Sequence, residues 1–154
     1  MLGPCVRPGM TVLDVGCGMG FFSLGLARLV GEGGRVISVD LQPQMLRVLE
    51  RRARRKGLAG RIETRLAGSD GLGIHEAVDF ALCFWMVHEV GDQAALFGEL
   101  FRILRPGGHL FVAEPSMHVR AEELEASVKQ ALTAGFEEVT RPGVRLSAAV
   151  VLKR

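Results

Sequence analysis

The chain has 154 residues, of which 48% are hydrophobic, enough for one domain with a substantial apolar core. No apolar run reaches the roughly 18 residues of a membrane-spanning helix, and no leader-like segment opens the sequence, so no membrane span is expected. The net charge of +2 gives no indication of a nucleic-acid partner, and three widely spaced cysteines form no disulfide framework, which favours a cytoplasmic protein.

The pattern over residues 12–30 predicts a buried strand, a glycine turn and a helix. Gly16, Gly18 and Gly20 allow positive φ angles and remove side chains that would hold a ligand away from the backbone. A dinucleotide fingerprint needs its third glycine one position later, where Phe21 stands. The spacing therefore favours a ligand without a pyrophosphate, such as a nucleoside with an amino-acid tail, at the carboxyl end of the strand.

This segment resembles the first motif of the S-adenosylmethionine-dependent methyltransferases with a Rossmann-like fold. The resemblance covers about residues 12–153 and is closest to the small-molecule branch that includes ubiquinone and menaquinone methyltransferases. It implies S-adenosylmethionine as the cofactor. The residues that it assigns to the cofactor site here are Asp14, Gly16, Cys17, Gly18 and Gly20.

A second strand is predicted over 35–40, where β-branched residues are frequent. It ends in Asp40, whose carboxylate has the position of one that accepts both hydroxyls of a ribose. The alternative is an aspartate that caps the next helix. Leu41, which follows, is assigned to the cofactor site as well.

The next helix begins at Pro43, runs to about residue 56 and carries six basic residues. An RNA-binding face is one interpretation of this charge. A solvated helix face is the favoured one, because no aromatic residues for base stacking lie between the cations.

After a third strand over 61–66, three residues resemble the adenine-contacting segment of the family: Ser69, Asp70 and Gly71. An ordinary Ser-Asp-Gly turn is the alternative. Residues 72–77 are too few and too rich in glycine for the helix that the family has there.

A fourth strand over 78–83 leads into the substrate side of the pocket. The resemblance implies that Cys83 and Phe84 contact the methionine part of the cofactor, and that Trp85, Met86 and His88 face the methyl acceptor. His88 is the candidate general base, because histidine ordinarily titrates near pH 6.5, and a structural or surface role is the alternative. No histidine pair with i, i+4 spacing supports a metal site, so no metal is expected.

The rest of the chain predicts a helix over 93–104, a helix stop at Arg-Pro-Gly-Gly over 105–108, and a strand over 109–113. Leu-Arg-Pro-Gly-Gly-His-Leu-Phe-Val in this region again resembles the family. Glu114 follows the strand and either lines the acceptor pocket or caps the next element. A helix over 122–134 precedes two strands, 136–140 and 144–153, which a short turn makes antiparallel.

The expected fold is α/β, Rossmann-like and doubly wound, with a seven-stranded, mostly parallel sheet, an antiparallel C-terminal hairpin strand and helices on both faces. One domain, 1–154, is expected, without the N-terminal segment that covers the pocket in family members. The pocket is therefore expected to be open, or covered by a second copy or a partner subunit. The predicted function is methyl transfer from S-adenosylmethionine to a small-molecule acceptor. The alternatives are a cofactor-binding scaffold subunit and, less favoured, a nicotinamide-dependent oxidoreductase.

Overall fold

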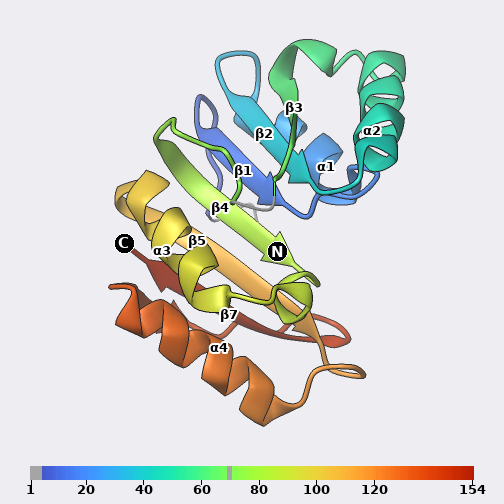
Figure 1. Cartoon of the computed structure of the whole chain (residues 1–154). Coiled ribbons are helices and arrows are strands. Elements are labelled where there is room, and N and C mark those ends of the chain that lie inside the picture. Colours follow the sequence, from blue (N-terminus) through green and yellow to red (C-terminus); the bar gives the residue numbers. More distant parts are fainter. Residues whose placement is uncertain (1–4, 69–70) are drawn as a thin grey trace.

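The structure is a computed structural model that describes residues 5–68 and 71–154. A seven-stranded sheet forms its centre (Figure 1). The strands are β1 (Thr11–Val15), β2 (Arg35–Asp40), β3 (Ile62–Leu66), β4 (Val78–Phe84), β5 (Leu104–Pro115), β6 (Glu137–Thr140) and β7 (Ser147–Lys153). The helices are α1 (Phe21–Val30), α2 (Pro43–Arg55), α3 (Gln93–Ile103) and α4 (Ala121–Thr133), with short 3₁₀ helices η1 (Ala59–Arg61) and η2 (Val87–Glu89).

The strand order is β3-β2-β1-β4-β5-β7-β6. Strands β1 to β5 are parallel, and β7 is antiparallel to both of its neighbours, β5 and β6. The order reverses beside β1, which pairs with β2 on one side and β4 on the other. This topology confirms the predicted fold class, and it brings the loops that follow β1, β2 and β4 to one edge of the sheet.

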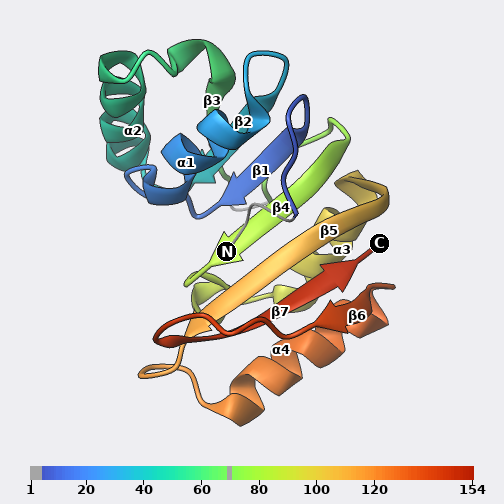
Figure 2. The same ribbon diagram turned by 180° about the vertical axis from the view of Figure 1, so that it is seen from behind.

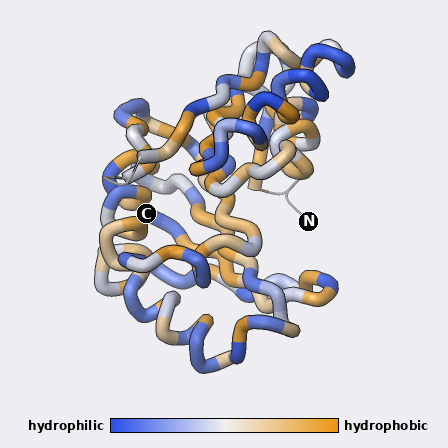
Figure 3. Tube along the Cα trace, turned by 45° about the vertical axis from the view of Figure 1, so that its right-hand side comes forward, coloured by the Kyte–Doolittle hydropathy of each residue, from blue (hydrophilic) through white to orange (hydrophobic). Residues whose placement is uncertain are grey.

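Alternate residues of each central strand enter two separate cores. On β4, Ala81 and Cys83 pack in the core beneath α3 and α4, whereas Phe80 and Leu82 pack in the core beneath α1 and α2. Figure 2 shows α1 over one face of the sheet, with α3 and α4 behind the other. Figure 3 shows hydrophobic residues concentrated in the interior and hydrophilic ones on the outer helices. Burial on both faces explains the nearly continuous apolar runs of these strands.

Helix α2 shows how the pattern determines which side faces the sheet. Leu46, Leu49 and Ala53 are buried at helical spacing, and Pro43 occupies the first turn, where its missing N–H costs nothing. The arginines lie mainly on the exposed side, and Arg52 donates a hydrogen bond to the carbonyl oxygen of Met19 at 2.6 Å. In the part of the chain that the structure describes, no helix is both long and apolar enough to cross a membrane.

The largest differences between the structure and the prediction lie at the starts of two strands, β5 and β7. Helix α3 ends at Ile103, and β5 begins at Leu104, which pairs with Val78 in the sheet. The predicted stop over 105–108 therefore belongs to the strand, because the main chain there bonds to Arg154 near the end of the chain. Strand β7 begins only at Ser147, because the preceding Leu146 has a left-handed φ of 60° that interrupts extended backbone.

Candidate functional site

The glycine turn after β1 has the conformation that its sequence requires. Gly16, Gly18 and Gly20 have φ angles of 67°, 52° and 80°, which residues other than glycine rarely adopt. A β-carbon at Gly16 would lie 2.9 Å from Met86, and one at Gly20 only 2.2 Å from Leu49. At Gly18, by contrast, it would meet open space. The outer glycines thus allow close packing, while the middle one borders an unfilled volume at the sheet edge.

Asp40 ties this turn to the end of β2. Its Oδ2 accepts the backbone N–H of Gly18 at 2.8 Å, and its Oδ1 accepts that of Gln42 at 2.9 Å. The backbone N–H of Cys17 also donates to the carbonyl oxygen of Val39 at 3.0 Å. Two motifs that are 22 residues apart in the sequence therefore form one structure. The half-buried carboxylate lies between the turn and the exposed Leu41, where a polar ligand can reach it.

Asp14 lies below the turn, inside the protein. Its carboxyl group is 2% exposed and accepts the hydroxyl of Ser23 at 2.5 Å, and the Ser23 hydroxyl in turn accepts that of Ser38 at 3.0 Å. Burial raises the pKa of Asp14 to about 7, although the Ser23 hydrogen bond acts in the opposite direction. The sequence did not single out Ser23 or Ser38. Their positions, on the buried side of a helix and inside a buried strand, are the pattern that could have revealed them.

The two cysteines of the predicted site are interior residues. Cys17 is 7% exposed and Cys83 fully buried, and burial raises the pKa of both thiols above the ordinary value. Neither thiol is suited to nucleophilic attack. Phe84, the neighbour of Cys83, is half-buried, and its ring centroid lies 4.4 Å from that of Phe22 in the first turn of α1.

The predicted adenine segment is described only at its end. Ser69 and Asp70 lie outside the described residues. Gly71 has a φ of 132°, and a β-carbon there would lie 2.6 Å from the Glu99 carboxylate of α3. That carboxylate accepts the backbone N–H of Leu72 at 3.1 Å, so Glu99 anchors the loop from the helix below. No helix occurs among the described residues between β3 and β4, as the short sequence there predicts.

His88 and Glu114 form a pair that the sequence did not predict. The Nδ1 atom of His88 contacts Oε2 of Glu114, whose other oxygen accepts the backbone N–H of Val87 at 2.9 Å. Glu114 is 1% exposed, whereas about a third of the His88 side chain is exposed. An ionised carboxylate only accepts, so Nδ1 donates to it, and the neutral form of the ring then leaves Nε2 as an acceptor.

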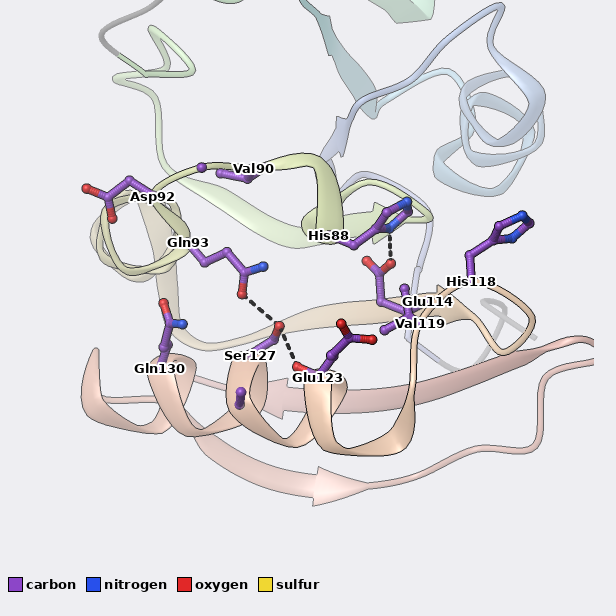
Figure 4. A pocket seen from close by; sticks show the side chains of 12 residues that line it. His88, Val90, Asp92, Gln93, Glu114, His118, Val119, Glu123, Ser127 and Gln130 are labelled. Atoms are coloured by element: carbon purple, nitrogen blue, oxygen red, sulfur yellow. Dashed lines mark hydrogen bonds and ion pairs between the residues drawn. The ribbon is translucent and has the colours of Figure 1, made fainter.

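A cavity of about 520 Å³ opens beside this pair (Figure 4). Its lining comes from η2, the start of α3, the end of β5 and α4. The lining residues are His88, Val90, Gly91, Asp92, Gln93, Glu114, His118, Val119, Glu123, Ala126, Ser127 and Gln130. A hydrogen bond of 2.7 Å from the Ser127 hydroxyl to Oε1 of Gln93 connects the two helices across the cavity.

The residues predicted to face the acceptor therefore do not all lie in the same place. His88 and Glu114 line the cavity, whereas the Met86 side chain packs against Gly16. Trp85 is 46% exposed and donates its indole N–H to the Ser147 hydroxyl at 2.8 Å. Gln93 and Ser127 were missed because each is an ordinary helix residue whose place in the cavity depends on how α3 and α4 pack.

Comparisons with known proteins agree with this geometry. A family model described as a methyltransferase domain matches residues 7–145. The ubiquinone/menaquinone biosynthesis C-methyltransferase UbiE of Klebsiella pneumoniae is 34% identical over 110 residues, which are 71% of this chain and 44% of that protein. The UbiE protein of Pasteurella multocida is 34% identical over 110 residues, 71% of this chain and 41% of its own length. The chain thus spans less than half the length of these relatives.

Solved structures show the same architecture. A SAM-dependent methyltransferase from Aquifex aeolicus has a TM-score of 0.84 and 26% identity, and the match covers 96% of this chain and 83% of that one. Fibrillarin from Aeropyrum pernix, crystallised with natively bound S-adenosyl-L-methionine, shares the fold with a TM-score of 0.75 and 21% identity, over 96% and 68% of the two chains. With the family model matching most of its length, the chain belongs to the methyltransferase domain family.

Proposed function

We propose that this protein transfers a methyl group from S-adenosylmethionine to a small-molecule acceptor. The observation that carries the proposal is the hydrogen bond between the glycine turn and Asp40. It places the Asp40 carboxylate next to Gly18, beside which there is open space at the carboxyl end of the sheet. A nucleoside with an amino-acid tail fits such a site, because the backbone lies close and a carboxylate is available for ribose hydroxyls.

Several residues hold the cofactor in this proposal. Asp40 receives the ribose hydroxyls, with Leu41 beside it, and Ser69, Asp70 and Gly71 border the adenine. The main chain of Gly16, Cys17, Gly18 and Gly20 and that of Cys83 and Phe84 surround the methionine part. Asp14 supports this turn from inside, through Ser23 in α1. When bound, the cofactor supplies a methyl group on a positively charged sulfur.

The protein's main contribution to such a reaction is alignment, which can supply roughly 7–11 kcal/mol of a barrier. We assign the acceptor to the cavity beside His88, whose Nε2 then removes the proton that the acceptor loses. Glu114 orients the ring through Nδ1. The relatives that carry the UbiE name act in quinone biosynthesis, which supports a small-molecule acceptor over a macromolecule.

The cytoplasm is the location that we propose. Cys5, Cys17 and Cys83 are all free thiols, in keeping with a reducing compartment. A second copy or a partner subunit over the mouth of the site is also part of the proposal, supported by exposed apolar side chains such as Phe21 and Leu41 at this edge.

Calorimetric titration with S-adenosylhomocysteine, the reaction product, tests the function. We expect micromolar binding by the wild-type protein and at least about tenfold weaker binding by Asp40→Ala, because hydrogen bonds to a charged group are lost. Glu32→Ala, which removes an exposed carboxylate far from the turn, is the matched control and binds as the wild type does.

Asp40→Asn removes the negative charge and keeps an acceptor oxygen for the Gly18 N–H, while it gives up the hydrogen bond from Gln42. Binding as weak as in Asp40→Ala would show that the negative charge itself is needed. A wild-type protein that ignores S-adenosylhomocysteine and binds nicotinamide dinucleotide instead would overturn the proposal in favour of an oxidoreductase. Binding of neither would leave a scaffold subunit as the better description.

A further inference from the structure

The outer face of α2 carries four exposed arginines, Arg47, Arg51, Arg54 and Arg55. Their spacing places them within an arc of about 100° around the helix, on the side opposite the residues that are buried against the sheet. Along the helix axis they span about 12 Å, because each residue advances the helix by about 1.5 Å. Figure 1 shows α2 at the outer margin of the molecule, so this arginine face points away from the protein.

The charges of the arginine face are not compensated within the protein. Among residues 5–68 and 71–154, none of its four arginines forms an ion pair. The one acidic residue of α2 is Glu50, and its carboxylate accepts the Thr64 hydroxyl of β3 at 2.6 Å. Elsewhere, Arg65 and Arg141 each pair with two carboxylates. Like charges three or four positions apart destabilise a helix, so an anionic partner would relieve a repulsion that the bare face carries.

A hollow of about 470 Å³ lies among these side chains. Its lining residues are Val48, Arg51, Arg52, Arg54 and Arg55. Guanidinium groups donate paired hydrogen bonds to phosphate oxygens, whereas the aliphatic parts of arginine and valine are apolar. The lining therefore suits a phosphate that is attached to an apolar molecule.

Exposed apolar side chains lie on both sides of α2. On one side, Arg52 donates to the carbonyl oxygen of Met19 at 2.6 Å, and Met19 is 53% exposed. On the other side, Glu50 contacts Thr64, and Leu66, which follows two residues later on the same side of β3, is 56% exposed. Because Glu50 and Arg52 point about 160° apart around the helix, Met19 and Leu66 flank it.

We propose that α2 docks the protein on the surface of an anionic lipid bilayer. The arginine face binds the headgroup phosphates, and Met19 and Leu66 enter the boundary between the headgroups and the acyl chains. A nucleic-acid backbone would satisfy the arginines alone, and α2 has no aromatic residue on which bases could stack. The contact is peripheral, and it does not depend on the proposed methyl transfer.

Sedimentation with lipid vesicles tests the docking. The wild-type protein is mixed with vesicles that contain phosphatidylglycerol and phosphatidylcholine in equal amounts, or with vesicles of phosphatidylcholine alone. We expect binding to the mixed vesicles, weakening as the salt concentration rises, and little binding to the neutral ones.

Substitutions locate the contact. Arg51→Gln combined with Arg54→Gln should weaken binding to the mixed vesicles about 30-fold, because each arginine near an anionic bilayer contributes about a factor of five. The matched control combines Arg102→Gln with Arg145→Gln, which removes the same charge from exposed positions outside α2 and should bind the vesicles as the wild type does. Both double variants should bind S-adenosylhomocysteine normally. Leu66→Ser should weaken vesicle binding about threefold or more, since an apolar contact is lost.

Three outcomes would overturn the docking. The first is no binding of the wild-type protein to the mixed vesicles, which would leave α2 with a merely solvated face. The second is an equal effect of the two double variants, which would show that only net charge matters. The third is tighter binding to polyuridylic acid that Leu66→Ser leaves unchanged, which would assign the arginines to RNA. The proposed methyl transfer would survive each of them, since it fails only if the wild-type protein does not bind S-adenosylhomocysteine.

Discussion

At the scale of single residues, His88 gains its proposed role from a partner 26 positions away. The Glu114 carboxylate contacts Nδ1 and is itself fixed by the Val87 N–H, so the imidazole has a defined orientation at the cavity wall. We expect His88→Ala to lower the rate of methyl transfer to an acceptor about 100-fold or more, which is the ordinary contribution of a positioned base. The affinity for S-adenosylhomocysteine should stay unchanged.

Release of S-adenosylhomocysteine in the presence of that acceptor measures the effect. His75→Ala, an exposed histidine on the loop before β4, is the matched control. Glu114→Gln keeps an acceptor for Nδ1–H and is expected to lose less activity than His88→Ala. Normal turnover in His88→Ala would show that the histidine is structural and that the acceptor needs no base from this chain.

The ionisation of Asp14 is expected to make the free energy of unfolding depend on pH. Its pKa is raised to about 7 by burial, so below about pH 7 the neutral carboxyl is the favoured form in the folded protein. The resulting stability is fully present below the unfolded-state pKa of about 4 and is lost as the pH rises through about 7. Between about pH 5 and pH 8 the free energy of unfolding should therefore fall by about 2–3 kcal/mol from this group.

Urea unfolding of the wild-type protein and Asp14→Asn at the two pH values checks this expectation. Asparagine imitates the neutral carboxyl and does not titrate, so the difference in stability between the two proteins isolates the contribution of Asp14. Parallel changes in the two proteins would show that the carboxyl group has an ordinary pKa when folded. Ser23→Ala removes the hydrogen bond that lowers this pKa and should make the pH dependence steeper.

At the scale of elements, the sequence predicted what local periodicity determines. Strand β2 agrees with its predicted range at both ends, and helix α1 follows the predicted glycine turn and ends at the predicted Val30, because glycines and β-branched runs act within a few residues. The glycine turn was predicted for the same reason. The partners that make its outer glycines necessary, Met86 and Leu49, were not, since they come from distant segments.

The errors have the same physical origin. Residues 105–108 contain a proline and two glycines, which locally favour a helix stop, yet hydrogen bonds to Arg154 make them part of β5. The contact between His88 and Glu114 depends on the packing of η2 against β5, which no spacing in the sequence encodes. Sequence patterns thus predicted the glycine turn and the strand that ends in Asp40, which are local features, but not the lining of the cavity, which forms only when distant elements meet.

At the scale of the whole molecule, both cores share the same central sheet, and β1, β2, β4, β5 and β7 contribute residues to each. Neither half of the chain buries its strands alone, because β1 lies between β2 and β4. We therefore predict that the protein unfolds as one cooperative domain. Helical circular dichroism, which reports α1 to α4, and the emission of Trp85 at the sheet edge should show the same thermal midpoint.

Ligand binding extends this test to the whole fold. S-adenosylhomocysteine at 100 times its dissociation constant should stabilise the protein by about 2.7 kcal/mol and raise both midpoints together by about 5–10 °C. At the same concentration Asp40→Ala, with an affinity about tenfold lower, should be stabilised by about 1.4 kcal/mol and show about half of the shift. Separate midpoints for the two signals, or a shift in only one, would show that the half containing β1 to β3 and the glycine turn unfolds independently of the half containing β5 to β7.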